Sequence, residues 1–183
     1  MSTDIIYLAL AVLSFALALN LKLTIAVLRT ARRERSMPPA LAAGQDVPPV
    51  LARTLDGERP VDLVAQGQPA VLLFLSSKCP KCRAKLPELA RMAPGARQAG
   101  LALWLVSEEP RWRLRRFLRG SSLSPIAARV SEADYRLLNA SLTSPAYFFI
   151  DHQGVLEAAG LIGDANWLAL REQLAQADIG QAA

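Results

Sequence analysis

The chain has 183 residues, which is enough for one ordinary domain and an additional segment. Its composition, 52% hydrophobic and 20% charged, excludes an intrinsically disordered protein. The net charge of +5 does not indicate nucleic-acid binding, because the sequence has no zinc-finger spacing, RNP-type aromatic motif or homeodomain-like helix. With only two cysteines, no disulfide framework supports the fold.

The chain begins with a long apolar run from Ile5 to Leu28, in which the only charged side chain is Lys22. Its length reaches the roughly 20 residues that a helix needs to cross a bilayer. A cleaved signal peptide is the alternative, but it calls for basic residues before a shorter apolar run. Here Asp4 precedes the run and arginines follow it. We therefore expect residues 1–28 to form a transmembrane anchor in contact with membrane lipid, and no cleavage.

Residues 29–48 form a linker that is first basic and then rich in proline. Four arginines follow the apolar run directly, which by the positive-inside rule favours a cytoplasmic position for this flank; they are Arg29, Arg32, Arg33 and Arg35. The folded domain is expected over residues 49–183.

Strands and helices alternate along this domain. The apolar run 70–75 is typical of a buried central strand. The remaining pattern predicts a helix over 80–92, a strand over 101–106, a basic helix over 111–119, a helix over 132–138, a hairpin of strands 146–150 and 155–159 around a turn at 151–154, and a helix over 167–177 capped by Asn166. This order predicts an α/β sandwich with parallel first strands and an antiparallel last pair.

The two cysteines lie at the junction of the central strand and the following helix, in the sequence Cys79-Pro80-Lys81-Cys82. Cys79 would lie at the N-cap and Pro80 in the first turn, where unpaired N–H groups and the helix dipole stabilise a thiolate. We expect Cys79 to attack a disulfide and Cys82 to resolve the mixed disulfide. A zinc site is disfavoured, since the chain has only one histidine. Two inert core cysteines are the other alternative. We expect no metal and no cofactor.

A second motif, Ser144-Pro145, stands directly before the strand over 146–150. Proline can open a strand in the trans form, but upstream cysteines at this spacing favour a cis peptide in a tight turn. Such a bend would place the backbone of Ser144 beside Cys79. We expect Ser144 and Pro145, with Pro80 and Lys81, to line the groove that receives an extended segment of the substrate.

Three segments together resemble a known group of proteins. LFLSSKCPKC, the following Leu86-Pro87-Glu88-Leu89 and the ending SPAYFFIDHQGVLEAAGLI look like the membrane-anchored thioredoxin-like proteins of the TlpA/redoxin group. Within that group the chain is most similar to the MauD family of methylamine-utilisation accessory proteins, from the apolar N-terminus to the final motif. The resemblance implies a thioredoxin-like, three-layer α/β/α fold, with Cys79 attacking, Cys82 resolving and Pro145 as the cis-proline.

The resemblance also implies partners. These are a disulfide-bearing protein, such as the small subunit of methylamine dehydrogenase or a related amine dehydrogenase, and a membrane redox donor or acceptor. It places the domain on the periplasmic side of the inner membrane, where disulfides form. The arginine flank favours the cytoplasmic side. We expect the periplasmic side and keep the cytoplasmic side as the alternative.

Other functions stay open. A thioredoxin fold can serve as a non-catalytic assembly or chaperone module, or as a TlpA-like reductase in cytochrome maturation. A peroxiredoxin-type peroxidase and a copper carrier are disfavoured by the spacing of the cysteine pair and by the single histidine. The basic helix over 111–119 is expected to turn Leu114 and Phe117 inward, and its arginines would be either a solvated face or a docking face for an acidic partner or lipid.

Overall fold

A computed structural model of the chain describes residues 7, 10, 12–25 and 41–180, and the chain divides into two compact units, 1–38 and 39–183. In the first unit, residues 12–25 are helical and their side chains are exposed. Within the described ranges, no helix combines the length and the apolar character needed to cross a membrane. Parts of the predicted span from Ile5 to Leu28 lie outside these ranges.

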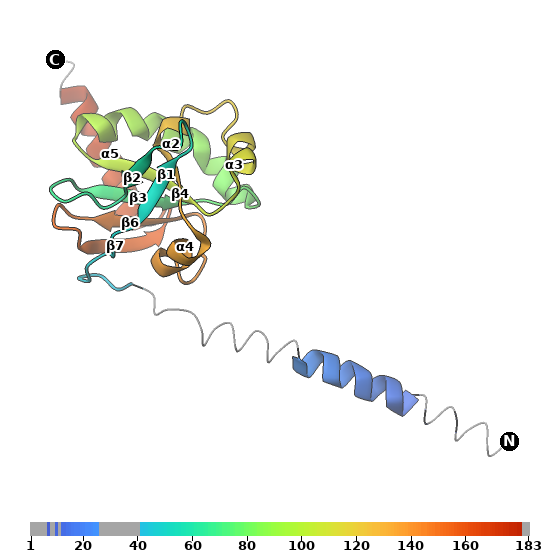
Figure 1. The fold of residues 1–183 in the computed structure, drawn as a ribbon. Helices are drawn as coiled ribbons and strands as arrows, with labels where there is room; N and C mark the ends of the chain where they lie inside the picture. The colour runs from blue at the N-terminus through green and yellow to red at the C-terminus, as the bar shows by residue number, and fades with distance from the viewer. Residues whose placement is uncertain (1–6, 8–9, 11, 26–40, 181–183) are drawn as a thin grey trace. The chain divides into compact units, whose positions relative to one another are not determined.

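The second unit is built on one seven-stranded sheet with the order β2-β1-β5-β4-β3-β6-β7 (Figure 1). Its strands are β1 (Leu51–Thr54), β2 (Pro60–Asp62), β3 (Ala70–Phe74), β4 (Ala102–Ser107), β5 (Ala127–Arg129), β6 (Ala146–Ile150) and β7 (Leu156–Leu161). The pairs β3–β4 and β4–β5 are parallel. β6 is antiparallel to both β3 and β7, so the predicted change from parallel to antiparallel pairing is confirmed.

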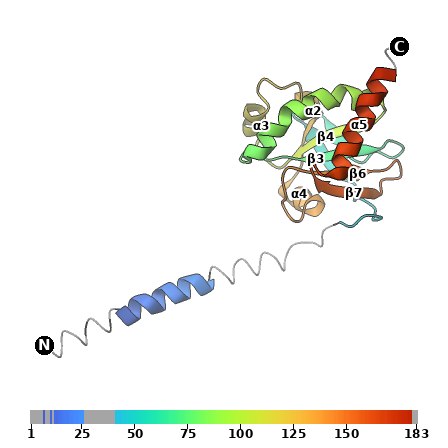
Figure 2. The same cartoon turned by 180° about the vertical axis from the view of Figure 1, so that it is seen from behind.

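Helices cover both faces of this sheet (Figures 1 and 2). α2 (Pro80–Gln98), α3 (Arg111–Phe117) and α5 (Ala165–Gly180) contribute to the core on one face, and α4 (Glu132–Leu138) to the core on the other. Successive residues of β3 point alternately into the two cores: Val71 and Leu73 into the first, Leu72 and Phe74 into the second. A strand buried on both faces therefore needs the continuous apolar run seen in the sequence, and the predicted three-layer α/β/α arrangement is confirmed.

α2 continues six residues beyond the predicted end at residue 92. The sequence there, Ala93-Pro94-Gly95-Ala96, contains residues that favour an end to a helix. In the fold α5 packs on this part of α2, and a Cβ added at Gly95 would be in ordinary van der Waals contact, at 3.5 Å, with the carbonyl oxygen of Leu174. Packing against α5 therefore outweighs the local preference.

The cap of α5 differs from the prediction. The backbone N–H of Trp167 donates to Asp164 Oδ1 at 2.9 Å, so Asp164 caps the helix and the prediction of Asn166 was wrong. The same carboxylate accepts hydrogen bonds from the hydroxyl of buried Tyr147 at 2.9 and 3.0 Å. Burial, followed by this carboxylate, raises the pKa of Tyr147 to about 12. Asp164 therefore joins β6 to the start of α5.

Three short strands were not predicted: β1, β2 and β5 contain only three or four residues each.

The segment before β1 is hydrogen-bonded to the outer edge of β7, at the other side of the sheet from β2. Gly44 and Val47 donate backbone hydrogen bonds to the carbonyls of Leu156 and Gly154, and the N–H of Leu156 donates to Gln45. Residues 44–47 thus cover part of the outer edge of β7.

Candidate functional site

The topology brings three loops to one edge of the sheet. Phe74, the last residue of β3, lies between Val106 of β4 and Ala146 of β6. The loops that follow β3 and β4 and the loop that precedes β6 therefore meet beside the end of β3. Ligand and reaction sites in α/β sheets form at such carboxyl ends of parallel strands.

Cys79 caps α2. Its backbone is extended, its Sγ accepts the N–H of Cys82 at 3.4 Å, and Pro80 occupies the start of the helix. The first turn contains no acidic residue. The predicted placement of both residues is thus confirmed, and the positive end of the helix dipole lies at the sulfur.

The environment of Cys79 favours its thiolate. Partial burial opposes ionisation, but hydrogen bonds from the Cys82 side chain and from the backbone N–H groups of Cys82 and Lys81 outweigh it and lower the pKa of Cys79. The side chains of Lys78 and Lys81 are exposed on either side. Cys79 is itself partly exposed, so a nucleophilic sulfur is accessible from outside.

Cys82 has the opposite environment. It is fully buried in the core beneath α2, and burial raises the pKa of Cys82 to about 11. Its Sγ accepts the N–H of Ser76 at 3.5 Å. A buried thiol next to a nucleophilic one cannot be reached by a partner protein, but it can attack a disulfide formed on Cys79.

A carboxylate that the sequence analysis missed anchors the loop between β3 and α2. Glu109, in the loop after β4, accepts hydrogen bonds from the backbone N–H of Ser77 at 2.7 Å, from the Ser76 hydroxyl at 3.3 Å and from the Ser77 hydroxyl. Ser76 in turn donates its N–H to Cys82 and accepts the N–H of Cys79 on its carbonyl at 3.1 Å. Glu109 thus positions the residue that contacts both cysteines. Its place after the second parallel strand was the available signal, because the ends of β3 and β4 share one edge.

The structure brings Ser144 to the cysteines as predicted, and the Ser144–Pro145 peptide bond is cis. The thiol of Cys79 donates to the carbonyl of Ser144 at 3.7 Å. Pro80 and Lys81 are exposed at the start of α2, whereas Ser144 is partly buried. Pro80, Lys81 and Ser144 therefore lie beside Cys79 and are at least partly exposed, whereas Pro145 is buried, and the role of all four toward a substrate stays a prediction.

A buried asparagine supports the loop that carries Ser144. Asn139 is 4% exposed, and its side chain donates to the carbonyl of Thr143 at 2.9 Å and accepts the N–H of Thr143 at 3.1 Å. Between them, Leu142 has a φ of 51°, which a leucine rarely adopts. The paired hydrogen bonds stabilise this turn directly before Ser144. No pattern in the sequence singled out Asn139.

The only histidine, His152, lies in the turn after β6. The register pairs Ile150 with Ala70, at the start of β3, so this turn lies at the opposite end of β3 from Cys79. In the parts of the chain that the structure describes, no three His, Cys, Asp or Glu side chains are grouped to hold a metal ion.

Comparison with known proteins identifies the group to which this architecture belongs. Residues 43–159 match the model of the AhpC/TSA family. A search of curated proteins gives no match.

Solved structures share the fold. They include the thioredoxin domain of a thiol-disulfide oxidoreductase from Bacteroides vulgatus (TM-score 0.62, 18% identity, 74% of this chain and 99% of that chain). A thiol:disulfide interchange protein from Bacteroides sp. matches with a TM-score of 0.61 and 19% identity over 73% and 91% of the chains. A peroxiredoxin-like protein from Aquifex aeolicus matches with a TM-score of 0.60 and 16% identity over 77% and 90%. At these identities the likeness establishes a thioredoxin-like fold.

The two thiols are expected to titrate far apart. In a Cys82→Ser variant, alkylation of Cys79 should reach half its maximal rate below pH 8.5, the value for a free cysteine, because the backbone donors of Lys81 and residue 82 remain. In a Cys79→Ser variant, Cys82 should still titrate well above pH 8.5, because burial, the largest cause of its raised pKa, remains although the contributions of Cys79 are lost. Iodoacetamide labelling from pH 5 to 11 measures both values. Equal midpoints for the two variants would contradict the assigned environments.

Glu109→Gln should destabilise the domain, because glutamine has one acceptor oxygen where glutamate has two, and its amide nitrogen cannot accept a hydrogen bond from Ser76 or Ser77. We expect the free energy of unfolding to fall by about 1–3 kcal/mol, measured by urea denaturation of the full chain in detergent. Glu108→Gln is the matched control. Burial, followed by the nearby Glu132, raises the pKa of Glu108, so the folded state disfavours its charge and removing that charge should not destabilise the protein at neutral pH. A loss for Glu108→Gln equal to that for Glu109→Gln would argue against the anchoring role of Glu109.

Proposed function

The chain belongs to the AhpC/TSA family, and we propose that it is a thiol–disulfide oxidoreductase that acts on a disulfide of a partner protein. The observation that carries the proposal is the contrast between the two thiols. Cys79 is accessible with a lowered pKa, and Cys82 is buried with a pKa of about 11. The solved structures with this fold include thiol–disulfide oxidoreductases, which is consistent with the proposal.

The reaction runs in two exchanges. The Cys79 thiolate attacks one sulfur of the partner disulfide, a mixed disulfide forms, and the other partner sulfur leaves as a thiolate that takes up a proton. Cys82 then loses its proton and attacks Cys79, which releases the second partner thiol and leaves a Cys79–Cys82 disulfide. Two electrons pass from this chain to the partner. In the reverse direction the same steps oxidise a partner dithiol.

The loop at Ser144 provides a place for the partner chain. Its carbonyl lies at the Cys79 sulfur, so an extended segment lying along Ser144 and Pro145 would present its disulfide to that sulfur. Main-chain pairing of this kind gives affinity without requiring a particular sequence. Pro80 and Lys81 would form the other wall of the groove.

The finer assignment comes from the resemblance to the MauD family. On that basis the partner is the disulfide-rich small subunit of methylamine dehydrogenase or of a related amine dehydrogenase, and this chain assists its maturation. A TlpA-like role in cytochrome maturation is the second candidate, supported by the likeness to the wider group. Electrons would pass to or from a membrane redox protein.

We also propose that the N-terminal segment anchors the protein in the inner membrane, with the folded domain in the periplasm. The apolar run from Ile5 to Leu28 supports an anchor, and the exposed apolar side chains of the helix over 12–25 are suited to lipid. Exchange of protein disulfides supports the periplasm, because disulfides persist there. The arginine flank supports the cytoplasmic alternative.

Replacing each cysteine should have a distinct result. Cys79→Ser removes the nucleophile, so exchange with a protein disulfide should fall to the uncatalysed rate. Cys82→Ser removes the resolving thiol, so the mixed disulfide should accumulate and be visible on a non-reducing gel as a covalent complex with the partner. Co-expression with the small subunit of methylamine dehydrogenase, scored by its maturation, tests the finer assignment. Full maturation with Cys79→Ser would favour a non-catalytic assembly role.

The membrane proposal is tested by topology. In spheroplasts, added protease should digest the folded domain, and alkaline extraction should leave the full chain in the membrane fraction. A reporter that is active only in the periplasm, fused at the C-terminus, should be active. Protection of the domain until the spheroplasts are lysed would place it in the cytoplasm.

A further inference from the structure

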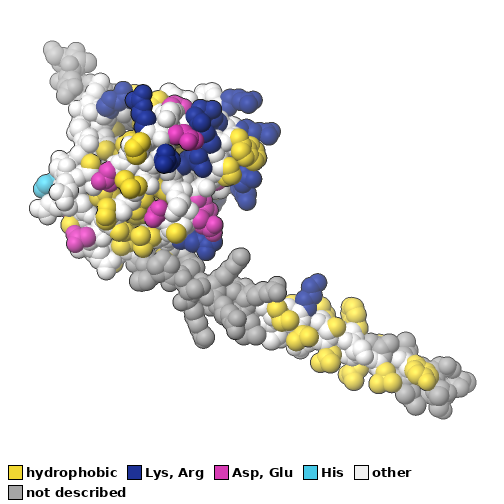
Figure 3. Space-filling view, in the orientation of Figure 1, with side chains coloured by type: hydrophobic (Ala, Val, Ile, Leu, Met, Phe, Trp, Pro, Cys, Tyr) yellow, Lys and Arg dark blue, Asp and Glu magenta, His cyan; other side chains and the backbone are white. Residues whose placement is uncertain are grey.

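Charge is unevenly distributed along the folded unit. Residues 78–119 contain eleven lysines and arginines and three acidic residues, whereas the rest of residues 39–183 contains five basic and eleven acidic residues. The basic segment comprises α2, α3 and the strand between them, and Figure 3 shows Lys and Arg side chains gathered over α2 and α3. This segment therefore has a net charge of +8 and the rest of the folded unit a net charge of −6, a difference that the total charge conceals.

α3 holds its buried face in the core and turns its arginines outward. Leu114 and Phe117 are 1% and 2% exposed, as predicted. Arg115, Arg116 and Arg119 are exposed, and among the described residues none has a carboxylate within 4.0 Å.

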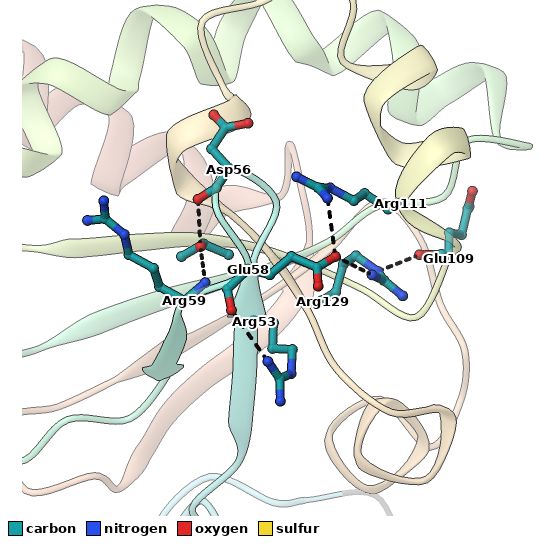
Figure 4. A network of polar contacts seen from close by, with 8 residues as sticks. Arg53, Asp56, Glu58, Arg59, Glu109, Arg111 and Arg129 are labelled. Carbon is teal, nitrogen blue, oxygen red and sulfur yellow. Dashed lines mark hydrogen bonds and ion pairs between the residues drawn. The ribbon is translucent and has the colours of Figure 1, made fainter.

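The first arginine of α3 has a structural role instead. Arg111 lies 3.5 Å from a carboxylate oxygen of Glu58, and Arg129 lies 3.7 Å from the same oxygen (Figure 4). Arg129 also donates to the carbonyl of Glu109 at 3.1 Å. These contacts join the start of α3 to the sheet and leave the later arginines available to a partner.

The exposed arginines are continuous with the cysteine site. The guanidinium of Arg83, directly after Cys82, lies over the ring of Phe117 at 5.4 Å. Lys78 and Lys81 are exposed on either side of Cys79. Trp112 is 62% exposed, with the guanidinium of Arg113 over its ring at 5.1 Å. Tryptophan and arginine are the residues most enriched where protein interfaces derive their binding energy.

We propose that this basic surface docks an acidic face of the protein whose disulfide Cys79 exchanges. The basic surface comprises Lys78, Lys81, Arg83, Trp112, Arg113, Arg115, Arg116 and Arg119. The inference rests on the proposed function and names the chemistry of the partner. An anionic lipid surface is disfavoured, because Lys78 and Lys81 flank Cys79 and a membrane covering them would also cover the thiol.

Docking through complementary charge would mainly raise the rate at which the two proteins associate. Complementary charges raise association rates and suppress partners of the wrong charge. The interaction should therefore fall steeply with salt, because the Debye length shortens from about 10 Å at 0.1 M to about 3 Å at 1 M.

The test uses two peptides of equal length, each with one internal disulfide, flanked in one by glutamates and in the other by lysines. At low salt, the reduced full chain in a neutral detergent should reduce the glutamate-flanked peptide about tenfold faster than the lysine-flanked peptide. This preference should vanish at 1 M salt. Arg115→Glu combined with Arg116→Glu should bring the rate for the acidic peptide down to that for the lysine-flanked peptide.

The matched control is Arg91→Glu combined with Arg97→Glu, which changes the total charge equally. Both residues are exposed on α2, and Arg97 lies about 27 Å from Cys79 along the helix axis. This variant should keep the preference for the acidic peptide. All variants should reduce hydroxyethyl disulfide, a small neutral probe, at the wild-type rate.

The outcomes separate this inference from the proposed function. A wild-type chain that reduces neither the peptides nor hydroxyethyl disulfide would overturn both. Equal rates with the two peptides, or equal losses in the two double variants, would overturn the docking surface and leave the exchange activity. Equal rates with the two peptides, together with binding to phosphatidylglycerol vesicles that Arg115→Glu combined with Arg116→Glu abolishes, would assign the basic surface to lipid instead.

Discussion

The pairing of β3 with β4 and β6 is the constraint on which the site depends. Because Phe74 is hydrogen-bonded in register between Val106 and Ala146, the loops carrying the cysteines, Glu109 and Ser144 end at one edge of the sheet. These residues are separated in the chain by up to 65 positions, and only the register of a fully buried strand brings them together. A slip of one residue would exchange the two faces of β3 and separate the three loops.

The two thiols differ in reactivity because of where α2 begins. They are three positions apart in the chain, so they lie about one turn apart at the start of α2. Cys79 at the cap receives backbone donors and solvent, while Cys82 faces the core. The difference is thus a consequence of where the helix begins, and Pro80 at its first position helps to set that point. Ser76 contacts both cysteines, so Glu109, which binds Ser76, acts on the pair as a unit.

The elements that were predicted correctly are those that depend on local sequence patterns. The buried run of β3, the helix over 132–138 and the start of α2 at Pro80 depend on periodicity and capping chemistry within a few residues. The errors involve distant partners. Asp164 rather than Asn166 caps α5 because its carboxylate also receives the hydroxyl of Tyr147, and α2 extends past Pro94 because α5 packs on it. Glu109 acts on a loop that comes close to it only in the folded sheet, so no short window of sequence could identify it. Asn139 acts locally, on Thr143 four residues later, but no pattern in the sequence marked this turn.

The two interpretations of the basic helix, a solvated face and a docking face, are compatible once its anchoring is known. A short helix held only by two apolar residues would present its charges in no defined direction. Here Leu114 and Phe117 fill the core, Arg111 is held by Glu58, and Phe117 contacts Arg83 beside the cysteines. The backbone of the outward arginines is therefore held in a fixed position relative to Cys79. Charges next to Cys79 can select disulfides by the charge of the protein around them, whereas the exchange chemistry itself responds to the thiol pKa values and the reduction potential of the disulfide.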